Sequence, residues 1–188
     1  MEIIPVLYLS RIFERNQVSP LYLRDIMKKQ GFSDLYVIDE QGIKKNQPQY
    51  DFYQRFSPMF ELWVDTGPRD VGDVVDDIFS GAKRVIIRLN LWTGKSLSRV
   101  RELTDHDILL AVDKNQMNDL YANPLLYEES DGIVVFMTTQ VKTGFKGESV
   151  LNQVIRNKPV YIFDSKEYES YWSTKNINGL LQDINLYV

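Results

Sequence analysis

The chain has 188 residues, 44% of them hydrophobic, which favours a single domain over residues 1–188 with one hydrophobic core. Its formal net charge is −4 at pH 7, with 22 Lys and Arg residues against 26 Asp and Glu residues, so it lacks the basic field that a nucleic-acid partner requires. The absence of cysteine excludes a disulfide scaffold and a Cys-ligated zinc site.

Seven short runs of strand-forming residues recur along the chain, and an eighth run follows at residues 183–188. Each run holds about six residues rich in Val, Ile, Leu, Tyr and Phe, and successive starts lie about 23 to 32 residues apart, the span of one strand plus one crossover helix. Their continuous apolar character is typical of parallel strands buried on both faces. The runs begin at Glu2, Asp34, Glu61, Arg84, Ile108, Gly132 and Pro159.

Between these runs the apolar residues take helical spacing. Residues 20–30 predict a helix that follows Ser19 and ends at Gly31. Residues 69–80 predict a second helix, and shorter helices are expected over residues 48–56, 97–104 and 147–156. In the second helix we expect the intervening aspartates to lie on the outer side. The residues expected to pack on the sheet are Val71, Val74, Val75, Ile78 and Phe79.

This alternation predicts an α/β fold, specifically a compact (β/α)8 TIM barrel with a short or missing last helix. An open, doubly wound parallel sheet fits the same pattern, but the Gly-rich phosphate turn that usually follows its first strand is absent here. Because no sequence remains for a final helix, we expect a partner subunit to cover the strands near the terminus, and therefore a homo-oligomer. The aromatic density of residues 50–60 also indicates a helix buried on more than one side.

The N-terminus runs directly into the first predicted strand, without a basic and then apolar signal segment. No apolar run approaches the roughly 20 residues needed to span a bilayer. We therefore expect a cytoplasmic protein that has no membrane partner.

Four of the runs end in an aspartate, at Asp39, Asp65, Asp113 and Asp164. In a barrel of this type the chemistry lies where the strands end, so these side chains are candidates for a shared site. Each aspartate taken alone could instead cap the loop or helix that follows it. Several carboxylates together could also bind a hard cation such as Mg²⁺, but the sequence fixes no coordination geometry, and we predict neither a metal nor a cofactor.

The order and spacing of the strands resemble one family of barrels. The segments that carry the resemblance are IIPVLYL from Ile3, SPLYLRDIMKKQGFSDLYVIDEQGI from Ser19, ELWVDTGPRDVGDVVDDIFSGAKRVII from Glu61 and ILLAVDKN from Ile108. They are similar to the first five βα units of HisA, the phosphoribosylformimino-aminoimidazole carboxamide ribotide isomerase of histidine biosynthesis, and of its cyclase relative HisF. The resemblance covers residues 2–115 and implies a barrel of the ribulose-phosphate-binding type.

That family uses two aspartates, which end the first and fifth strands, as general acid and base, with a threonine at the end of the sixth strand. The resemblance therefore implies catalytic roles for Asp113 and Thr138, with Asp39 as a supporting polar contact. The first-strand aspartate is replaced by Tyr8, and a phenol with a reference pKa of about 10 is a poor base near neutral pH. The ordinary isomerase reaction of the family is therefore not expected.

The family also holds two phosphates with glycine-rich strand ends, and these are degraded here. The third strand ends in DTGPR in place of a glycine run, and Arg88 stands where the family has a glycine. The loop KTGFKG from Lys142 runs into a predicted helix, whose N-terminus could hold one anionic group. The predicted substrate-binding residues are Tyr8, Asp65, Gly67, Arg69, Arg88, Lys142, Gly144 and Asp164.

These observations predict a HisA-related barrel that binds a small anionic metabolite, which could be phosphorylated. The protein would isomerise or otherwise transform that metabolite in coenzyme or amino-acid biosynthesis. The alternative is a non-catalytic barrel that serves binding, regulation or assembly.

Overall fold

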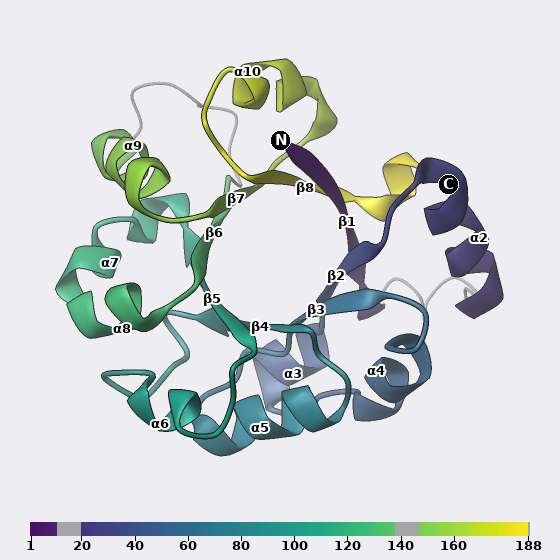
Figure 1. Ribbon diagram of the computed structural model, residues 1–188, viewed down its shortest axis with the longest axis horizontal. Helices are drawn as coiled ribbons and strands as arrows, with labels where there is room; N and C mark the ends of the chain where they lie inside the picture. The colour runs from purple at the N-terminus through teal and green to yellow at the C-terminus, as the bar shows by residue number, and fades with distance from the viewer. Residues whose placement is uncertain (11–19, 138–146, 188) are drawn as a thin grey trace.

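The computed structural model describes residues 1–10, 20–137 and 147–187 and contains a closed barrel of eight parallel strands. Each strand pairs with the next, and the last pairs with the first, which closes the ring seen in Figure 1. The predicted TIM barrel is confirmed, and the open sheet is excluded. The strands are β1 (Glu2–Tyr8), β2 (Asp34–Ile38), β3 (Glu61–Asp65), β4 (Arg84–Arg88), β5 (Asp107–Asp113), β6 (Gly132–Phe136), β7 (Val160–Phe163) and β8 (Gly179–Asp183).

Helices surround the outside of the ring (Figure 1). They are α2 (Pro20–Gln30), α3 (Glu40–Lys45), α4 (Tyr50–Phe56), α5 (Val71–Phe79), α6 (Ser98–Arg101), α7 (Asp119–Ala122), α8 (Pro124–Glu129), α9 (Glu148–Asn157) and α10 (Glu169–Ser173). Three single turns of 3₁₀ helix complete the described part: η1 (Lys114–Gln116), η2 (Lys166–Tyr168) and η3 (Ile184–Leu186). The eighth predicted run, residues 183–188, is misplaced, because β8 ends at Asp183 and residues 184–186 form η3. After β8 the described chain forms only η3, in agreement with the expected short or missing last helix.

Two layers of apolar side chains form the core, one inside the barrel and one between the strands and the helices. The layers are distinct because successive residues of a strand point to opposite faces of the sheet. The interior is therefore filled by side chains and is no open pore. The interior layer consists of Ile4, Val6, Tyr36, Ile38, Trp63, Ile86, Leu109, Ala111, Val134, Phe136 and Leu181.

The N-terminal end of the barrel is closed by a cluster around Trp63. The Trp63 indole donates a hydrogen bond to Asp34 (2.7 Å), and its ring meets the Tyr161 ring edge-on at 4.7 Å. The Arg84 guanidinium lies 4.3 Å from the Trp63 ring centroid and forms ion pairs with Asp34 and Asp107, both at 3.0 Å. These contacts fill the end of the barrel opposite to the strand-end aspartates.

The predicted apolar face of α5 is partly wrong. Val74 is buried as expected, but Phe79 is 82% exposed, and the expected outer residue Asp77 is buried. Phe79 lies five residues beyond Val74, which at 3.6 residues per turn places it about 140° away around the helix axis. Asp77 lies closer to the buried face, where it accepts a hydrogen bond from the Thr66 hydroxyl (2.7 Å).

The aromatic residues of α4 and the following loop pack into the protein's own core. Phe52, Tyr53, Phe56 and Phe60 are all buried in the layer between strands and helices, and the Phe52 and Phe56 rings stack at 4.0 Å. Their density therefore needs no partner subunit to explain it. The predicted homo-oligomer stays a prediction.

The segment after β8 folds back beside α2 (Figure 1). There the Tyr187 ring meets the Phe32 ring edge-on at 5.1 Å, and the Tyr187 hydroxyl donates a hydrogen bond to Gln182 of β8. The chain itself thus covers part of the outer surface that lacks a final helix. Among the described residues, none of the helices combines the length and the apolar character needed to cross a membrane.

The buried carboxyl of Asp77 makes a prediction about stability. Burial raises the pKa of Asp77 well above its usual value of 3.8, and its Oδ1 atom has no hydrogen-bond partner among the described residues. Its contribution to folding stability is therefore full below the unfolded-state pKa and is lost as the pH rises toward the raised folded-state pKa. We expect Asp77→Asn to reduce the fall in melting temperature between pH 5 and pH 8.

The matched control is Asp76→Asn, which changes an exposed neighbour on the same helix. This control should keep the wild-type pH dependence, measured by calorimetry across the same range. An identical pH dependence in Asp77→Asn and the wild type would contradict the assignment.

Candidate functional site

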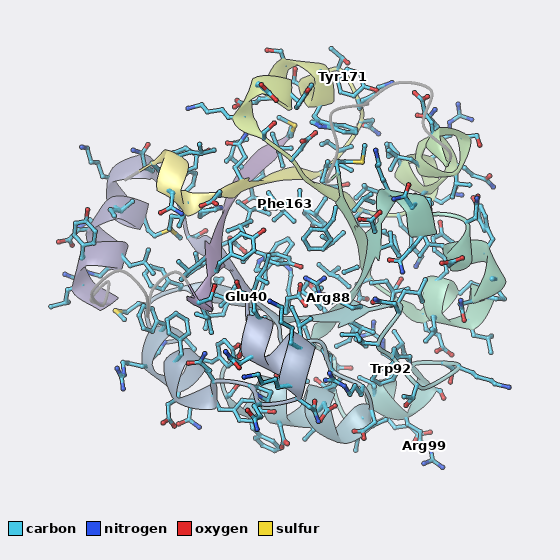
Figure 2. All side chains as sticks on the ribbon, turned by 180° about the vertical axis from the view of Figure 1, so that it is seen from behind. Glu40, Arg88, Trp92, Arg99, Phe163 and Tyr171 are labelled. Carbon is cyan, nitrogen blue, oxygen red and sulfur yellow. The ribbon has the colours of Figure 1, made fainter. Side chains whose placement is uncertain are left out.

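A cavity of about 590 Å³ opens at the C-terminal end of the barrel, a size that suits a small-molecule ligand. Figure 2 views the barrel from behind, with Arg88 and Phe163 at the opening, Glu40 near its rim, and Trp92, Arg99 and Tyr171 outside the ring. The cavity is lined by Tyr8, Ile38, Glu40, Ile43, Lys44, Arg88, Asn90, Ala111, Val112, Asp113, Gln116 and Phe136.

An ion pair between β3 and β4 fixes the position of Arg88 in this cavity. Arg88 donates from Nε (2.9 Å) and Nη2 (2.8 Å) to the two carboxylate oxygens of Asp65, which is fully buried. The guanidinium carbon lies 4.9 Å from the Phe136 ring centroid. This bidentate geometry orients the guanidinium as well as holding it.

The surroundings of the pair keep it charged. Burial lowers the pKa of Arg88, but the charge and hydrogen bonds of Asp65 outweigh this effect, so the pKa lies above its usual value. The Tyr36 hydroxyl donates a further hydrogen bond to Asp65 (3.1 Å). Burial, followed by the Asp65 charge, raises the pKa of Tyr36 well above 10, so the phenol stays a neutral donor. Among the described residues no hydrogen bond uses Nη1 of Arg88, which leaves this nitrogen for a ligand.

The short helix α3 brings three residues to the cavity, and Asp39 holds its N-terminus. One carboxylate oxygen of Asp39 accepts from the backbone N–H groups of Gln41 and Gly42, both at 3.0 Å. The other accepts from the Gln49 N–H (2.7 Å) and the Tyr53 hydroxyl (2.8 Å). Asp39 is therefore a fully buried helix cap that lies outside the cavity lining.

Arg69 holds the opposite end of α3. Its guanidinium donates to the backbone oxygens of Ile43 (2.9 Å) and Gly67 (3.0 Å) and to the Asn46 side chain (2.6 Å). Gly42 lets the helix lie close to the loop after β3, because a Cβ there would stand only 2.6 Å from the Thr66 oxygen. With both ends fixed, α3 presents Glu40, Ile43 and Lys44 to the cavity.

The alternation of side chains along each strand separates the four strand-end aspartates. Asp65 and Asp113 each lie an even number of residues after an interior residue of the same strand. Their side chains therefore point to the inside of the barrel, and both reach its mouth. Asp39 and Asp164 each come one residue after an inward-facing residue and turn outward. Asp164 accepts from the Trp172 indole of α10 (2.8 Å) and, like Asp39, lies outside the cavity lining.

Asp113 combines the two roles that the sequence left open. Its Oδ1 atom accepts from the Asn115 N–H (2.9 Å), and Gln116 completes a capping box at the start of η1. Asp113 also lines the cavity. Capping therefore fixes the carboxyl without removing it from the mouth.

The other predicted site residues have mixed locations. Tyr8 lines the cavity, whereas Gly67 and Arg69 lie outside its lining and belong to the support of α3. Thr138, Lys142 and Gly144 lie outside the described residues.

Sequence reasoning missed four polar residues of the lining: Glu40, Lys44, Asn90 and Gln116. Glu40 and Lys44 are four residues apart and so share one face of α3, but this six-residue helix was not predicted. Glu40 accepts hydrogen bonds from the backbone N–H (3.1 Å) and the hydroxyl of Ser10, which lies two residues after β1. Across residues 1–10, 20–137 and 147–187, no group of three or more His, Cys, Asp or Glu side chains is placed to hold a metal ion.

The comparisons with known proteins support the barrel fold, but they identify no family for this chain. No protein-family model matches the chain, and no curated protein matches it. Solved structures similar to it include oxaloacetate acetylhydrolase in complex with its product oxalate, at 13% identity and a TM-score of 0.60, covering 97% of this chain and 75% of that chain. The same enzyme in complex with the inhibitor 3,3-difluorooxalacetate has 12% identity, a TM-score of 0.60 and the same coverage.

Thiamine phosphate pyrophosphorylase from Pyrococcus furiosus is also similar, with 12% identity and a TM-score of 0.62. The similarity covers 97% of this chain and 85% of that chain. At such low identity these structures establish the barrel fold alone. No family match supports the predicted relationship to HisA.

The ion pair makes a prediction about stability. Removing one member of a buried pair leaves the other uncompensated, so we expect Arg88→Met to cost about 3 kcal/mol of unfolding free energy. Asp65→Asn should cost less, because cavity water can reach the remaining guanidinium. The double variant should lose at least about 1 kcal/mol less than the sum of the single losses, measured by urea denaturation.

Arg99→Met provides the control, because Arg99 is exposed and lies outside the ring (Figure 2). It should change the unfolding free energy by less than about 0.5 kcal/mol. Additive losses in the double variant would mean that Asp65 and Arg88 do not act as a pair.

Proposed function

We propose that this barrel binds a small acidic metabolite in its C-terminal mouth, with Arg88 and Lys44 contacting the anionic group. The observation that carries the proposal is the guanidinium of Arg88, which Asp65 holds inside the cavity. Its Nη1 atom forms no hydrogen bond with any described residue. Lys44 adds a second cation to the same lining. The complexes of oxaloacetate acetylhydrolase with oxalate and with 3,3-difluorooxalacetate show that a similar barrel binds small acids.

Asp113 is the proposed acid–base group. It lines the same cavity as Arg88, and its capping contact fixes the direction of the carboxyl. A ligand held by its anionic end at Arg88 would carry its remaining atoms toward this carboxyl, where a proton could be exchanged. The proposed transformation is therefore an isomerisation or another reaction that moves a proton.

The ordinary reaction of HisA is not part of this proposal. Tyr8 lines the cavity at the end of β1, where that family places its second catalytic aspartate. This same substitution favours the second candidate function, a non-catalytic barrel that uses the cavity for binding, regulation or assembly.

The binding proposal is tested by thermal-shift screening with small carboxylates and phosphate esters. A ligand that binds only the folded state raises the melting temperature, so we expect a rise with at least one acid. Lys44→Ala should weaken that ligand about two- to fivefold, the range of an exposed ion pair. Lys45→Ala, a change in the adjacent exposed residue outside the lining, should have no effect. Equal effects of the two changes would contradict the proposed contact.

The catalytic part is tested with Asp113→Asn. Asparagine caps a helix about as well as aspartate, so the fold of this region should be retained. We expect turnover of any ligand that the wild type transforms to fall by about 100-fold or more, with binding largely kept. Unchanged turnover in this variant would remove Asp113 as the acid–base group. Binding without any turnover by the wild type would favour the non-catalytic alternative.

A further inference from the structure

The amide of Gln116 is held at the cavity by a single hydrogen bond to the backbone. Its Oε1 atom accepts from the N–H of Asp113 (3.1 Å), which is one half of the capping box at the start of η1. Asp113 is the last residue of β5, so this bond keeps the Gln116 amide beside the end of that strand. Gln116 is half-buried and belongs to the cavity lining.

This bond also fixes the orientation of the amide. A glutamine side chain has one oxygen that accepts hydrogen bonds and one NH₂ group that donates two. A backbone N–H can bond only to the oxygen, so Oε1 faces the backbone and Nε2 lies on the other side of the amide. Nε2 donates to no described residue. The part of Gln116 that remains for a ligand is therefore a pure donor.

The turn that carries Gln116 is anchored on both sides. Lys114 is 6% exposed, and Met117, the next residue after η1, is fully buried. The backbone of the turn is thus fixed by the residues that flank Gln116, while the capping box fixes its side chain. A donor that is already in place loses little conformational freedom when a ligand binds, which makes it suited to discriminate between ligands.

Gln116 and Arg88 approach the cavity from neighbouring strands. Arg88 is the last residue of β4, and its Cα is paired with that of Ala111 in β5, two residues before Asp113. Neighbouring strands lie about 4.8 Å apart, a distance that a molecule of a few bonds spans. A ligand whose anionic group contacts Nη1 of Arg88 would therefore bring its next atoms toward the amide of Gln116.

We propose that Gln116 determines which acids the cavity accepts, by donating from Nε2 to an oxygen atom close to the anionic group of the ligand. This inference rests on the proposed function and names the class of acid, which is an oxo acid or a hydroxy acid. Carbonyl and hydroxyl oxygens both accept hydrogen bonds. A plain aliphatic acid offers no acceptor and would leave the NH₂ group without a partner once it displaced water.

The other amide of the lining, Asn90, has a different setting. It lies two residues after the end of β4, is exposed, and its side chain forms no hydrogen bond with any described residue. No such bond decides whether it presents its oxygen or its NH₂ group to a ligand. Asn90 is therefore the rival that an experiment on Gln116 has to distinguish.

The test compares ligands that differ by one oxygen atom. Butanoate and propyl phosphate are each compared with their 2-oxo and 2-hydroxy derivatives, by calorimetric titration into the full chain. In at least one series we expect an oxygenated derivative to bind about three- to tenfold more tightly than its parent, the effect of one neutral hydrogen bond. The two kinds of derivative show whether the preferred oxygen is a carbonyl or a hydroxyl.

Two variants remove the donor in different ways. Gln116→Glu keeps an oxygen for the N–H of Asp113, as a capping box allows, but replaces the NH₂ group with an acceptor. Gln116→Met removes the amide without adding a charge. In both variants the preference for the oxygenated ligand should fall below about twofold. The added charge of glutamate weakens parent and derivative alike, so the ratio of their affinities is the readout.

Gln153→Met is the matched control, because Gln153 is an exposed glutamine of α9 outside the cavity lining. This variant should keep the wild-type ratio. Melting temperatures show whether each variant is folded. Loss of the preference in Asn90→Ala, with no change in the two Gln116 variants, would assign the contact to Asn90 and overturn the inference.

The outcomes separate this inference from the proposed function. Parent acids that bind as tightly as their oxygenated derivatives, with affinities that fall in Lys44→Ala, would overturn the inference and leave the proposed function standing. A preference that survives in both Gln116 variants would also overturn the inference alone. Binding of no probe at all would overturn both.

Discussion

The mouth of this barrel depends on the ion pair between Asp65 and Arg88. A carboxylate that is fully buried is costly unless its partners satisfy it, and here the guanidinium contacts both oxygens while Tyr36 adds a third donor. The three residues come from β2, β3 and β4, so the parallel register of neighbouring strands brings them together. The same bonds that satisfy Asp65 fix the direction of Arg88, which gives the cavity a cation of defined orientation.

Helix α3 supplies the other half of the site. It has six residues, too few to be stable by itself, and is held by the Asp39 cap at one end and by Arg69 at the other. Sequence analysis predicted both as site residues, Asp39 as a supporting polar contact and Arg69 as a substrate-binding residue. Their role in the structure is to position Glu40 and Lys44, the residues of α3 that face the cavity with their charges.

The sequence predicted the barrel well because its signal is repeated. Continuous apolar runs at regular spacing, with helical patterns between them, allow few arrangements other than a ring of βα units. The helix at residues 71–79 was predicted for the same reason. The face that it buries was predicted partly wrongly. Buried Asp77 accepts a hydrogen bond from the Thr66 hydroxyl, and nothing local in the sequence reveals this partner.

The site was predicted only in part, and the reason is geometric. Four aspartates end similar runs, yet a shift of one residue along the pleated strand decides whether a carboxyl enters the barrel, as for Asp65, or turns outward, as for Asp39. Where each strand ends relative to its neighbours is set by pairing across the whole ring, and a single run does not encode it. Glu40 and Lys44 were missed because α3 contains Gly42 and lacks a recognisable apolar stripe.

The most direct test of this account is nitrogen-15 NMR of the arginine side chains. The Nε–H group of Arg88 is predicted to give a resolved signal that exchanges slowly with water, because it is hydrogen bonded to buried Asp65. That protection should disappear in Asp65→Asn, while the signals of exposed arginines such as Arg99 stay unchanged. An Arg88 Nε–H that exchanges as fast as that of Arg99 in the wild-type protein would contradict the pairing on which the proposed site is built.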